Sequence, residues 1–281
     1  MSKNDNYSEY LREKFPAKEG FVKRMEVLLG KNEAKEFFDI SYTKTPSSIR
    51  CNTLKISVEE LKKRLENYGW KLKQPFKEFP EVMIIESKIK PGELGKTKEH
   101  LLGYYYVQEV SSMLPMLVLK PKAGDFVLDL CASPGSKTTQ AAAMMKNKGT
   151  IIANEISMGR IGILNTNLER CGVMNSIVTR KEGVALCERF LKKTQFKFDK
   201  ILVDVPCSGE GTLRSSKQTY YQWNLKIVKN LPRLQKGLFA SAFELLAVGG
   251  EIIYSTCTHA PEENEGVVNW ALENFREKIK V

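Results

Sequence analysis

Histidine and paired cysteines are scarce in this chain of 281 residues. It has two histidines, His100 and His259, and none of its six cysteines belongs to a CxxC pair. Zinc sites and disulfide scaffolds normally show clustered cysteine and histidine residues. The sequence therefore predicts no metal site and no disulfide framework. The cysteines are expected to be buried or catalytic thiols, and they lie at Cys51, Cys131, Cys171, Cys187, Cys207 and Cys257.

Long apolar runs are also absent. No segment approaches the ~18 apolar residues that a membrane-spanning helix requires, and the opening MSKNDNYSEY is polar, unlike a signal peptide. Hydrophobic residues nevertheless make up 42% of the chain, enough for the cores of two domains. We expect a soluble, cytoplasmic monomer with no membrane partner.

Acidic residues are outnumbered by basic ones, 33 to 44, which gives a formal charge of +11. Residues 1–120 carry 22 basic and 17 acidic side chains, and residues 121–281 carry 22 and 16. A basic excess in both halves suits a nucleic acid that crosses both, although a merely soluble basic protein is the alternative. Candidate phosphate contacts are the runs 62–64 and 71–77, with Arg214 and Lys217.

The first hundred residues predict two small regions. Apolar residues at helical spacing, followed by the linker SYTKTPSS, predict a helical segment over 1–48. Residues 49–100 then predict a strand at 49–54, a helix capped by Ser57 and a strand at 82–85, which suggests a small α+β domain of RNA-recognition type without its aromatic signature. Tyr104 to Tyr106 could stack on bases or pack at a domain interface.

Residues 101–281 predict a second, larger domain. Strands and helices alternate from residue 121, with strands expected at 126–130, 150–154, 176–179, 200–205 and 251–255. This alternation is typical of an α/β fold with a doubly wound parallel sheet.

The chain is organised around Val127 to Thr138, VLDLCASPGSKT, where a buried strand turns into an Ala-rich helix. A phosphate-binding P-loop and a GxGxxG fingerprint are both absent. A strand ending in Asp129, a tight turn and a helix also suit the adenosine and methionine parts of S-adenosylmethionine. The turn itself supplies the candidate cofactor contacts Cys131, Ala132, Ser133, Pro134, Gly135, Ser136 and Lys137.

Further polar residues follow the later strands. Glu155 is placed to accept ribose hydroxyls, and Glu182, next to Gly183, to meet an adenine amino group. The fourth and fifth strands lead into DVPCSGEGT and YSTCT, which deliver Asp204, Cys207 and Cys257 to the same edge. Two thiols and a methyl donor suggest one reaction. A thiolate that adds to C6 of cytosine turns C5 into a nucleophile for the methyl group.

The motifs DLCASPGSKT, DVPCSGEGT, YSTCT and PEENEGVV together resemble the Sun-type RNA cytosine-5 methyltransferases. The phrases SIRCNTL, GYYYVQE and VTRKEG resemble the archaeal tRNA-modifying branch of that family. The resemblance implies a Rossmann-like class I methyltransferase fold, S-adenosylmethionine as cofactor and RNA, specifically tRNA, as partner.

The resemblance also implies residue roles. Cys257 would be the nucleophile, Cys207 would assist product release, Asp204 would contact the base and Lys137 would lie at the reacting centre. The cofactor contacts that it implies are Cys131, Gly135, Glu155, Arg160, Glu182 and Asp204. DNA cytosine-5 methyltransferases use the Pro-Cys thiol instead, which would nominate Cys207.

The chain departs from the family pattern at Val205, Glu155 and Glu182, which replace Ala, Asp and Asp with residues of the same chemical type. Sun-type chains normally continue into a final strand pair, so an incomplete sheet edge is expected after the helix predicted at 262–278. Alternatives are an rRNA methyltransferase, a non-catalytic RNA-binding protein with this fold and, more remotely, a cysteine hydrolase using Cys257 with His259.

Overall fold

The computed structural model describes residues 3–280. These residues form two compact units. The first, here called the helical unit, comprises 3–45, 206–237 and 256–280, and the second, the sheet unit, comprises 46–205 and 238–255. The units are therefore discontinuous in sequence, whereas the predicted division into 1–48, 49–100 and 101–281 followed the order of the chain.

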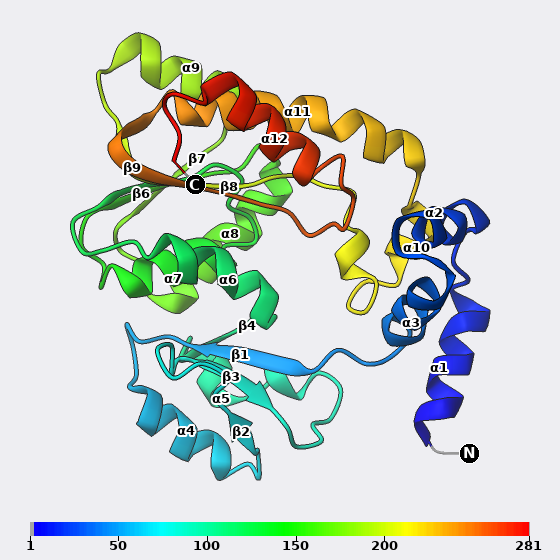
Figure 1. The fold of residues 1–281 in the computed structure, drawn as a ribbon. Helices are drawn as coiled ribbons and strands as arrows, with labels where there is room; N and C mark the ends of the chain where they lie inside the picture. Colours follow the sequence, from blue (N-terminus) through cyan, green and yellow to red (C-terminus); the bar gives the residue numbers. More distant parts are fainter. Residues whose placement is uncertain (1–2, 281) are drawn as a thin grey trace. The chain divides into compact units, whose positions relative to one another are not determined.

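A five-stranded parallel sheet forms the larger part of the sheet unit (Figure 1). Its strand order is β7-β6-β5-β8-β9, with every neighbouring pair parallel. The doubly wound sheet is thus confirmed, and the first, fourth and fifth predicted strands are neighbours. The strands are β5 (Phe126–Asp129), β6 (Thr150–Asn154), β7 (Ser176–Thr179), β8 (Phe198–Asp204) and β9 (Leu246–Ser255).

Helices cover both faces of this sheet because its strands are apolar on both sides. On one face, Val127 and Ile151 pack against α6 and α7, and Ala153 packs against α8. On the other face, Leu128 and Ile201 pack against α9 and the end of α11. These helices are α6 (Val110–Leu119), α7 (Ser136–Met144), α8 (Met158–Cys171), α9 (Gly183–Lys193) and α11 (Leu225–Phe243).

A four-stranded antiparallel sheet with the order β2-β3-β1-β4 forms the rest of the sheet unit. Strand β1 ends earlier than predicted because Asn52 turns the chain, its side chain donating to Gly103 O and Cys171 O. Ser57 caps the following helix as predicted, accepting from Glu60 N at 3.1 Å. The elements are β1 (Ser47–Cys51), α4 (Val58–Glu66), β2 (Leu72–Lys73), β3 (Val82–Ile85), η1 (Glu93–Gly95), α5 (Lys98–Leu101) and β4 (Tyr105–Val107).

Both faces of the small sheet are occupied. Ile49 and Tyr105 face α4 in one core, while Val82 on the opposite face packs against Met113 of α6. Tyr105 is buried in the core under α4 and Tyr106 is buried beside Arg50, whereas Tyr104 is half-buried. The sheet therefore offers no open aromatic platform for RNA bases.

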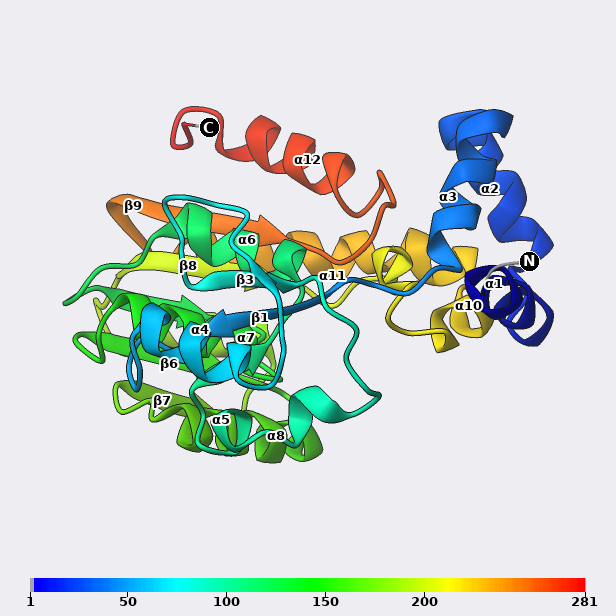
Figure 2. The same cartoon turned by 90° about the horizontal axis from the view of Figure 1, so that it is seen from below.

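The helical unit gathers segments from three parts of the chain. Helices α2 and α3 lie beside α10 (Figures 1 and 2), and Phe21, Phe38, Tyr220 and Trp223 share one core. Among residues 3–280, no helix is long and apolar enough to cross a membrane. The unit contains α1 (Lys3–Lys14), α2 (Glu19–Leu29), α3 (Lys31–Ser41), η2 (Glu210–Thr212), α10 (Gln218–Gln222), the first part of α11 and α12 (Glu265–Phe275).

Candidate active site

The turn between β5 and α7 is held by glycine and by contacts to α8. Gly135 has a φ of +98°, and a Cβ there would lie 3.0 Å from Leu164 Cδ1. Ser133 Oγ donates to Arg160 O at 2.9 Å, and Arg160 Nη2 donates back to Ser133 O at 2.6 Å. No side chain caps α7. The turn therefore offers a helix N-terminus to an anionic group such as a carboxylate.

Glu155 lies at the end of the neighbouring strand β6, as predicted. Its side chain is 2% exposed; Oε1 accepts from Ser157 N at 2.8 Å, and Oε2 lies 3.3 Å from Arg160 Nη1. A fixed, buried carboxylate retains lone pairs that can accept ribose hydroxyls. Arg160 thus contacts both predicted cofactor elements, the turn and Glu155.

Glu182 has a structural task that sequence reasoning missed. Its carboxylate caps α9, accepting from Val184 N at 3.1 Å and Ala185 N at 2.8 Å. A Cβ on the adjacent Gly183 would lie 2.5 Å from Leu238 Cδ2, so a larger residue there would require the Leu238 side chain to shift. Burial, with smaller contributions from the Asp129, Asp204 and Glu155 carboxylates, raises the pKa of the Cys131 thiol to about 12, so this thiol is neutral at physiological pH.

Asp129 ends β5 beneath the turn and is fully buried. Thr138 Oγ1 donates to its Oδ2 at 2.7 Å, whereas its buried Oδ1 has no hydrogen-bond partner among the described residues. Burial, assisted by the nearby Asp204, raises the pKa of Asp129 to about 7. The glycine turn, the buried Glu155 and this unpaired oxygen together fit a polar nucleoside cofactor bearing a charged amino-acid part.

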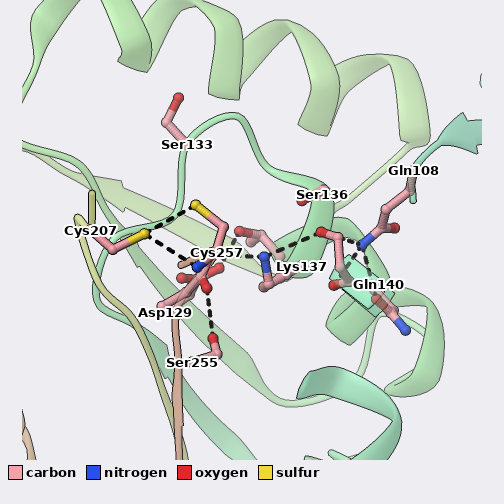
Figure 3. Close-up of polar contacts among 12 residues, drawn as sticks. Gln108, Asp129, Ser133, Ser136, Lys137, Gln140, Cys207, Ser255 and Cys257 are labelled. Carbon is pink, nitrogen blue, oxygen red and sulfur yellow. Dashed lines mark hydrogen bonds and ion pairs between the residues drawn. The ribbon is translucent and has the colours of Figure 1, made fainter. Parts of the chain in front are cut away.

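Lys137 and Asp204 form an ion pair in the sheet unit. Lys137 Nζ lies 2.8 Å from Asp204 Oδ2 and 3.3 Å from Ser112 Oγ. Ser255 Oγ donates to the other Asp204 oxygen at 2.6 Å. Figure 3 labels Lys137 and Ser255. Because both its oxygens are engaged, Asp204 has a fixed orientation at the end of β8.

Cys207 and Cys257 face each other in the helical unit with their Sγ atoms 3.0 Å apart (Figure 3). Cys257 N also donates to Cys207 Sγ at 3.2 Å. Cys257 is exposed and Cys207 is half-buried. The hydrogen bond to Cys257 and burial raise the pKa of Cys207 well above its usual range. A thiol with a raised pKa stays protonated at neutral pH, so Cys207 is able to donate in the hydrogen bond that the two sulfurs share.

Backbone and hydroxyl contacts fix the segments that carry the thiols. Gly211 N donates to Cys257 O at 2.9 Å, and the Ser208 and Thr258 hydroxyls share a hydrogen bond of 2.7 Å. Ser208 N donates to the fully buried Glu263 at 3.0 Å. Nothing in the sequence pattern singled out these residues, since each acts through a partner about fifty positions away.

Three other predicted side chains are used internally. Arg214 Nη2 donates to Thr43 Oγ1 and Lys44 O, and Lys217 Nζ donates to Ser41 O and Leu213 O. Both side chains therefore hold the backbone of the helical unit, and their contact with phosphates stays a prediction. His259 packs edge-on against Phe37 and lines a cavity of about 490 Å³ in the helical unit. Among residues 3–280, no cluster of His, Cys, Asp or Glu could hold a metal ion.

Arg50 is a further supporting residue that the analysis of motifs overlooked. It reaches from β1 to α7, donating to Ser136 O at 2.8 Å, to Thr139 Oγ1 at 2.8 Å and to Gln108 Oε1. Burial lowers the pKa of Arg50 to about 10, so the guanidinium remains charged at neutral pH. The small sheet thereby anchors the first turn of the helix that carries Lys137.

Two sequence profiles of one methyltransferase family match this chain. The profile of the 16S rRNA methyltransferase RsmB/F family matches residues 116–280, which is more than half of the chain. The profile of the N-terminal domain of 16S rRNA methyltransferase RsmF matches residues 17–110. The chain belongs to the RsmB/F family of RNA methyltransferases. That family is the Sun-type family expected from the motifs, and it depends on S-adenosylmethionine.

Curated members of the RsmB/F family are similar over most of this chain. Ribosomal RNA small subunit methyltransferase F of Vibrio parahaemolyticus is 40% identical over 93% of the chain and 54% of its own length. The protein of the same name from Pectobacterium carotovorum is 43% identical over 81% of the chain and 47% of its own length. The chain thus spans about half the length of these relatives. Their names do not support the expected closeness to the archaeal tRNA branch in particular.

Solved structures share the fold. A methyltransferase homologue from Pyrococcus horikoshii is 34% identical to this protein and superposes with a TM-score of 0.80. The match covers 98% of this chain and 84% of the homologue's chain. NSun6 from the same organism, solved with the S-adenosylmethionine analogue SFG, is 25% identical, covers 92% of this chain and 87% of its own, and has a TM-score of 0.80.

Proposed function

We propose that this protein transfers a methyl group from S-adenosylmethionine to C5 of a cytosine in the RNA of the small ribosomal subunit. The observation that carries the proposal is the pair of facing thiols at Cys207 and Cys257, since this reaction needs one sulfur to attack and a second group to assist its departure. The names of the RsmB/F relatives support rRNA rather than the tRNA predicted from sequence phrases.

Cys257 is the proposed nucleophile. Its thiolate adds to C6 of the cytosine, and the displaced ring electrons make C5 nucleophilic. Cys257 is the exposed member of the pair, and the neutral Cys207 thiol beside it can donate a hydrogen bond that stabilises negative charge on the Cys257 sulfur. The raised pKa of Cys207 leaves little thiolate there to attack.

Asp204 and Lys137 are the proposed base-contacting pair. The Asp204 carboxylate, oriented by Ser255, can accept a hydrogen bond from the exocyclic amino group of cytosine. Lys137 Nζ lies 2.8 Å from that carboxylate and places a cation at the reacting centre. Bound S-adenosylmethionine would supply the electrophilic methyl group there, held by the turn 131–137, Glu155 and Arg160.

Product release requires that the C5 proton is lost to a base and that the bond between C6 and sulfur breaks, its electron pair returning to Cys257. The departing sulfur becomes a thiolate. The Cys207 thiol can donate a hydrogen bond to that sulfur from 3.0 Å, which stabilises the leaving group. Cys207 is therefore needed after methyl transfer rather than before it.

Two single substitutions test these roles. Cys257→Ala should abolish both methylation and any covalent RNA complex. Cys207→Ala should still attack and methylate once, but should accumulate a protein–RNA adduct that survives denaturation, because elimination is slowed. Cys187→Ala, a buried cysteine on α9, is the matched control and should turn over normally. An adduct in Cys257→Ala and none in Cys207→Ala would reverse the two roles.

Bisulfite sequencing after incubation with either 16S rRNA or bulk tRNA identifies the substrate. Protection of a cytosine in 16S rRNA alone supports the proposal, whereas protection in tRNA alone supports the substrate first predicted from sequence. Cofactor binding and RNA binding without any protected cytosine or adduct would support the non-catalytic alternative.

A further inference from the structure

The structure has a basic groove whose lining includes none of the proposed catalytic or cofactor-binding residues. It has a volume of about 480 Å³ and lies in the sheet unit between the end of β7 and one face of α9. Its basic lining residues are Arg180, Lys181, Arg189 and Lys193, and its apolar lining includes Leu186 and Phe190. None of its lining side chains is acidic.

Helical periodicity explains why α9 presents these residues together. Leu186, Arg189, Phe190 and Lys193 follow the spacing i, i+3, i+4, i+7, which places them on one stripe of the helix. Leu186 is buried and Phe190 packs on Phe198, so the apolar members form the base of the stripe. The charged ends of the long side chains remain exposed.

The groove cations are not neutralised by neighbouring carboxylates. Among the described residues, the side chains of Lys181, Arg189 and Lys193 form no hydrogen bond or ion pair, and Arg180 donates only a long bond of 3.4 Å to Ile156 O. By contrast, Lys192 on the same helix pairs with Glu188 at 3.3 Å. Four neighbouring unpaired cations create a positive potential that attracts a polyanion.

We infer that this groove binds the sugar–phosphate backbone of the RNA substrate. Phosphates pair with the four cations, which confers affinity without base specificity. The exposed part of Phe190 offers a surface for an unstacked base or ribose. This inference rests on the proposed function for the identity of the polyanion, and it adds a binding surface that is separate from the thiols and the cofactor turn.

The test measures binding of fluorescently labelled 16S rRNA transcript as a function of salt. The groove variant is Arg189→Gln with Lys193→Gln. The control variant, Lys192→Gln with Lys197→Gln, removes the same charge from side chains that already have partners at Glu188 and Glu244 O. The groove variant should reduce the magnitude of the slope of log K against log[salt] by about 1.4 to 1.8. Extrapolated from about 1 M salt, this corresponds to binding that is roughly 25- to 60-fold weaker at 0.1 M salt.

Equal slopes for the groove and control variants would overturn the inference, whatever their methylation activity. Methylation of a short oligonucleotide by the groove variant at saturating concentration should be retained, because the groove does not contain the reacting residues. If the wild-type protein methylates no RNA but the groove variant still loses salt-dependent binding, the proposed activity fails while the binding surface stands.

Discussion

Asp129 should make the stability of the sheet unit depend on pH. Its pKa is raised to about 7 by burial, from an ordinary value of 3.8. The folded state therefore holds the proton more tightly than the unfolded state does, and stability falls as pH rises between these two values. The whole shift corresponds to roughly 4 kcal/mol, of which about 2 kcal/mol is lost between pH 5.5 and pH 8.

Urea unfolding followed by circular dichroism at pH 5.5, 6.5, 7.5 and 8 measures this loss. The variant Asp129→Asn is neutral at every pH and nearly isosteric, so the difference between wild type and variant isolates Asp129 from other titrating groups. Wild type should lose about 2 kcal/mol relative to the variant as pH rises from 5.5 to 8.

Thr138→Val provides the matched control. It removes the hydroxyl that donates to Asp129 Oδ2, a contact that lowers the pKa of Asp129. The pH-dependent loss should therefore move to higher pH in this variant. Parallel curves for wild type and Asp129→Asn across the range would refute the argument, since they would mean that Asp129 titrates alike in the folded and unfolded states.

Two further predictions concern the residues that shape the cofactor turn. Arg50→Met should lower the free energy of unfolding by about 3 kcal/mol, because it leaves buried acceptors on α7 without their charged donor. Its control is Lys55→Met, which removes an exposed cation bonded to backbone carbonyls. This control should lower the free energy of unfolding by under ~1 kcal/mol in the same urea assay. Gly135→Ala should weaken S-adenosylmethionine binding in calorimetry more than Gly124→Ala does. Both glycines have φ near +100°, but only at Gly135 does the added Cβ meet a neighbour, Leu164 Cδ1 at 3.0 Å. Equal losses of stability in Arg50→Met and Lys55→Met would show that the contact of Arg50 with α7 is unimportant. Equal losses of affinity in Gly135→Ala and Gly124→Ala would show the same for the contact of Gly135 with α8.

Local patterns predicted the strands of the parallel sheet well. The predicted limits 150–154 and 176–179 are those observed for β6 and β7, because each strand is a short apolar run between turn residues. These features depend on neighbouring residues, which a single sequence displays directly.

Features that depend on distant partners were not predictable in the same way. Arg214 and Lys217 were predicted as phosphate contacts from their charge alone, and nothing near them in the sequence indicates their bonds to Thr43 and Ser41, more than 170 positions earlier. Tyr106 looked able to stack on bases, but it is buried on the small sheet next to Arg50. The charge or aromatic ring of a side chain is visible in the sequence, whereas the distant residue that it contacts in the folded protein is not.

The two thiols show the same contrast between what the motifs predict and what distant contacts determine. The motifs predicted that Cys207 and Cys257 would come together, but not what keeps them together. The bonds from Gly211 N to Cys257 O and between the Ser208 and Thr258 hydroxyls involve neither sulfur. Removing the Cys207 sulfur takes away the bond from Cys257 N to that sulfur but leaves these two, which should keep Cys257 in place. An adduct that accumulates in Cys207→Ala would then report the loss of a proton donor to the leaving sulfur, rather than a displaced nucleophile.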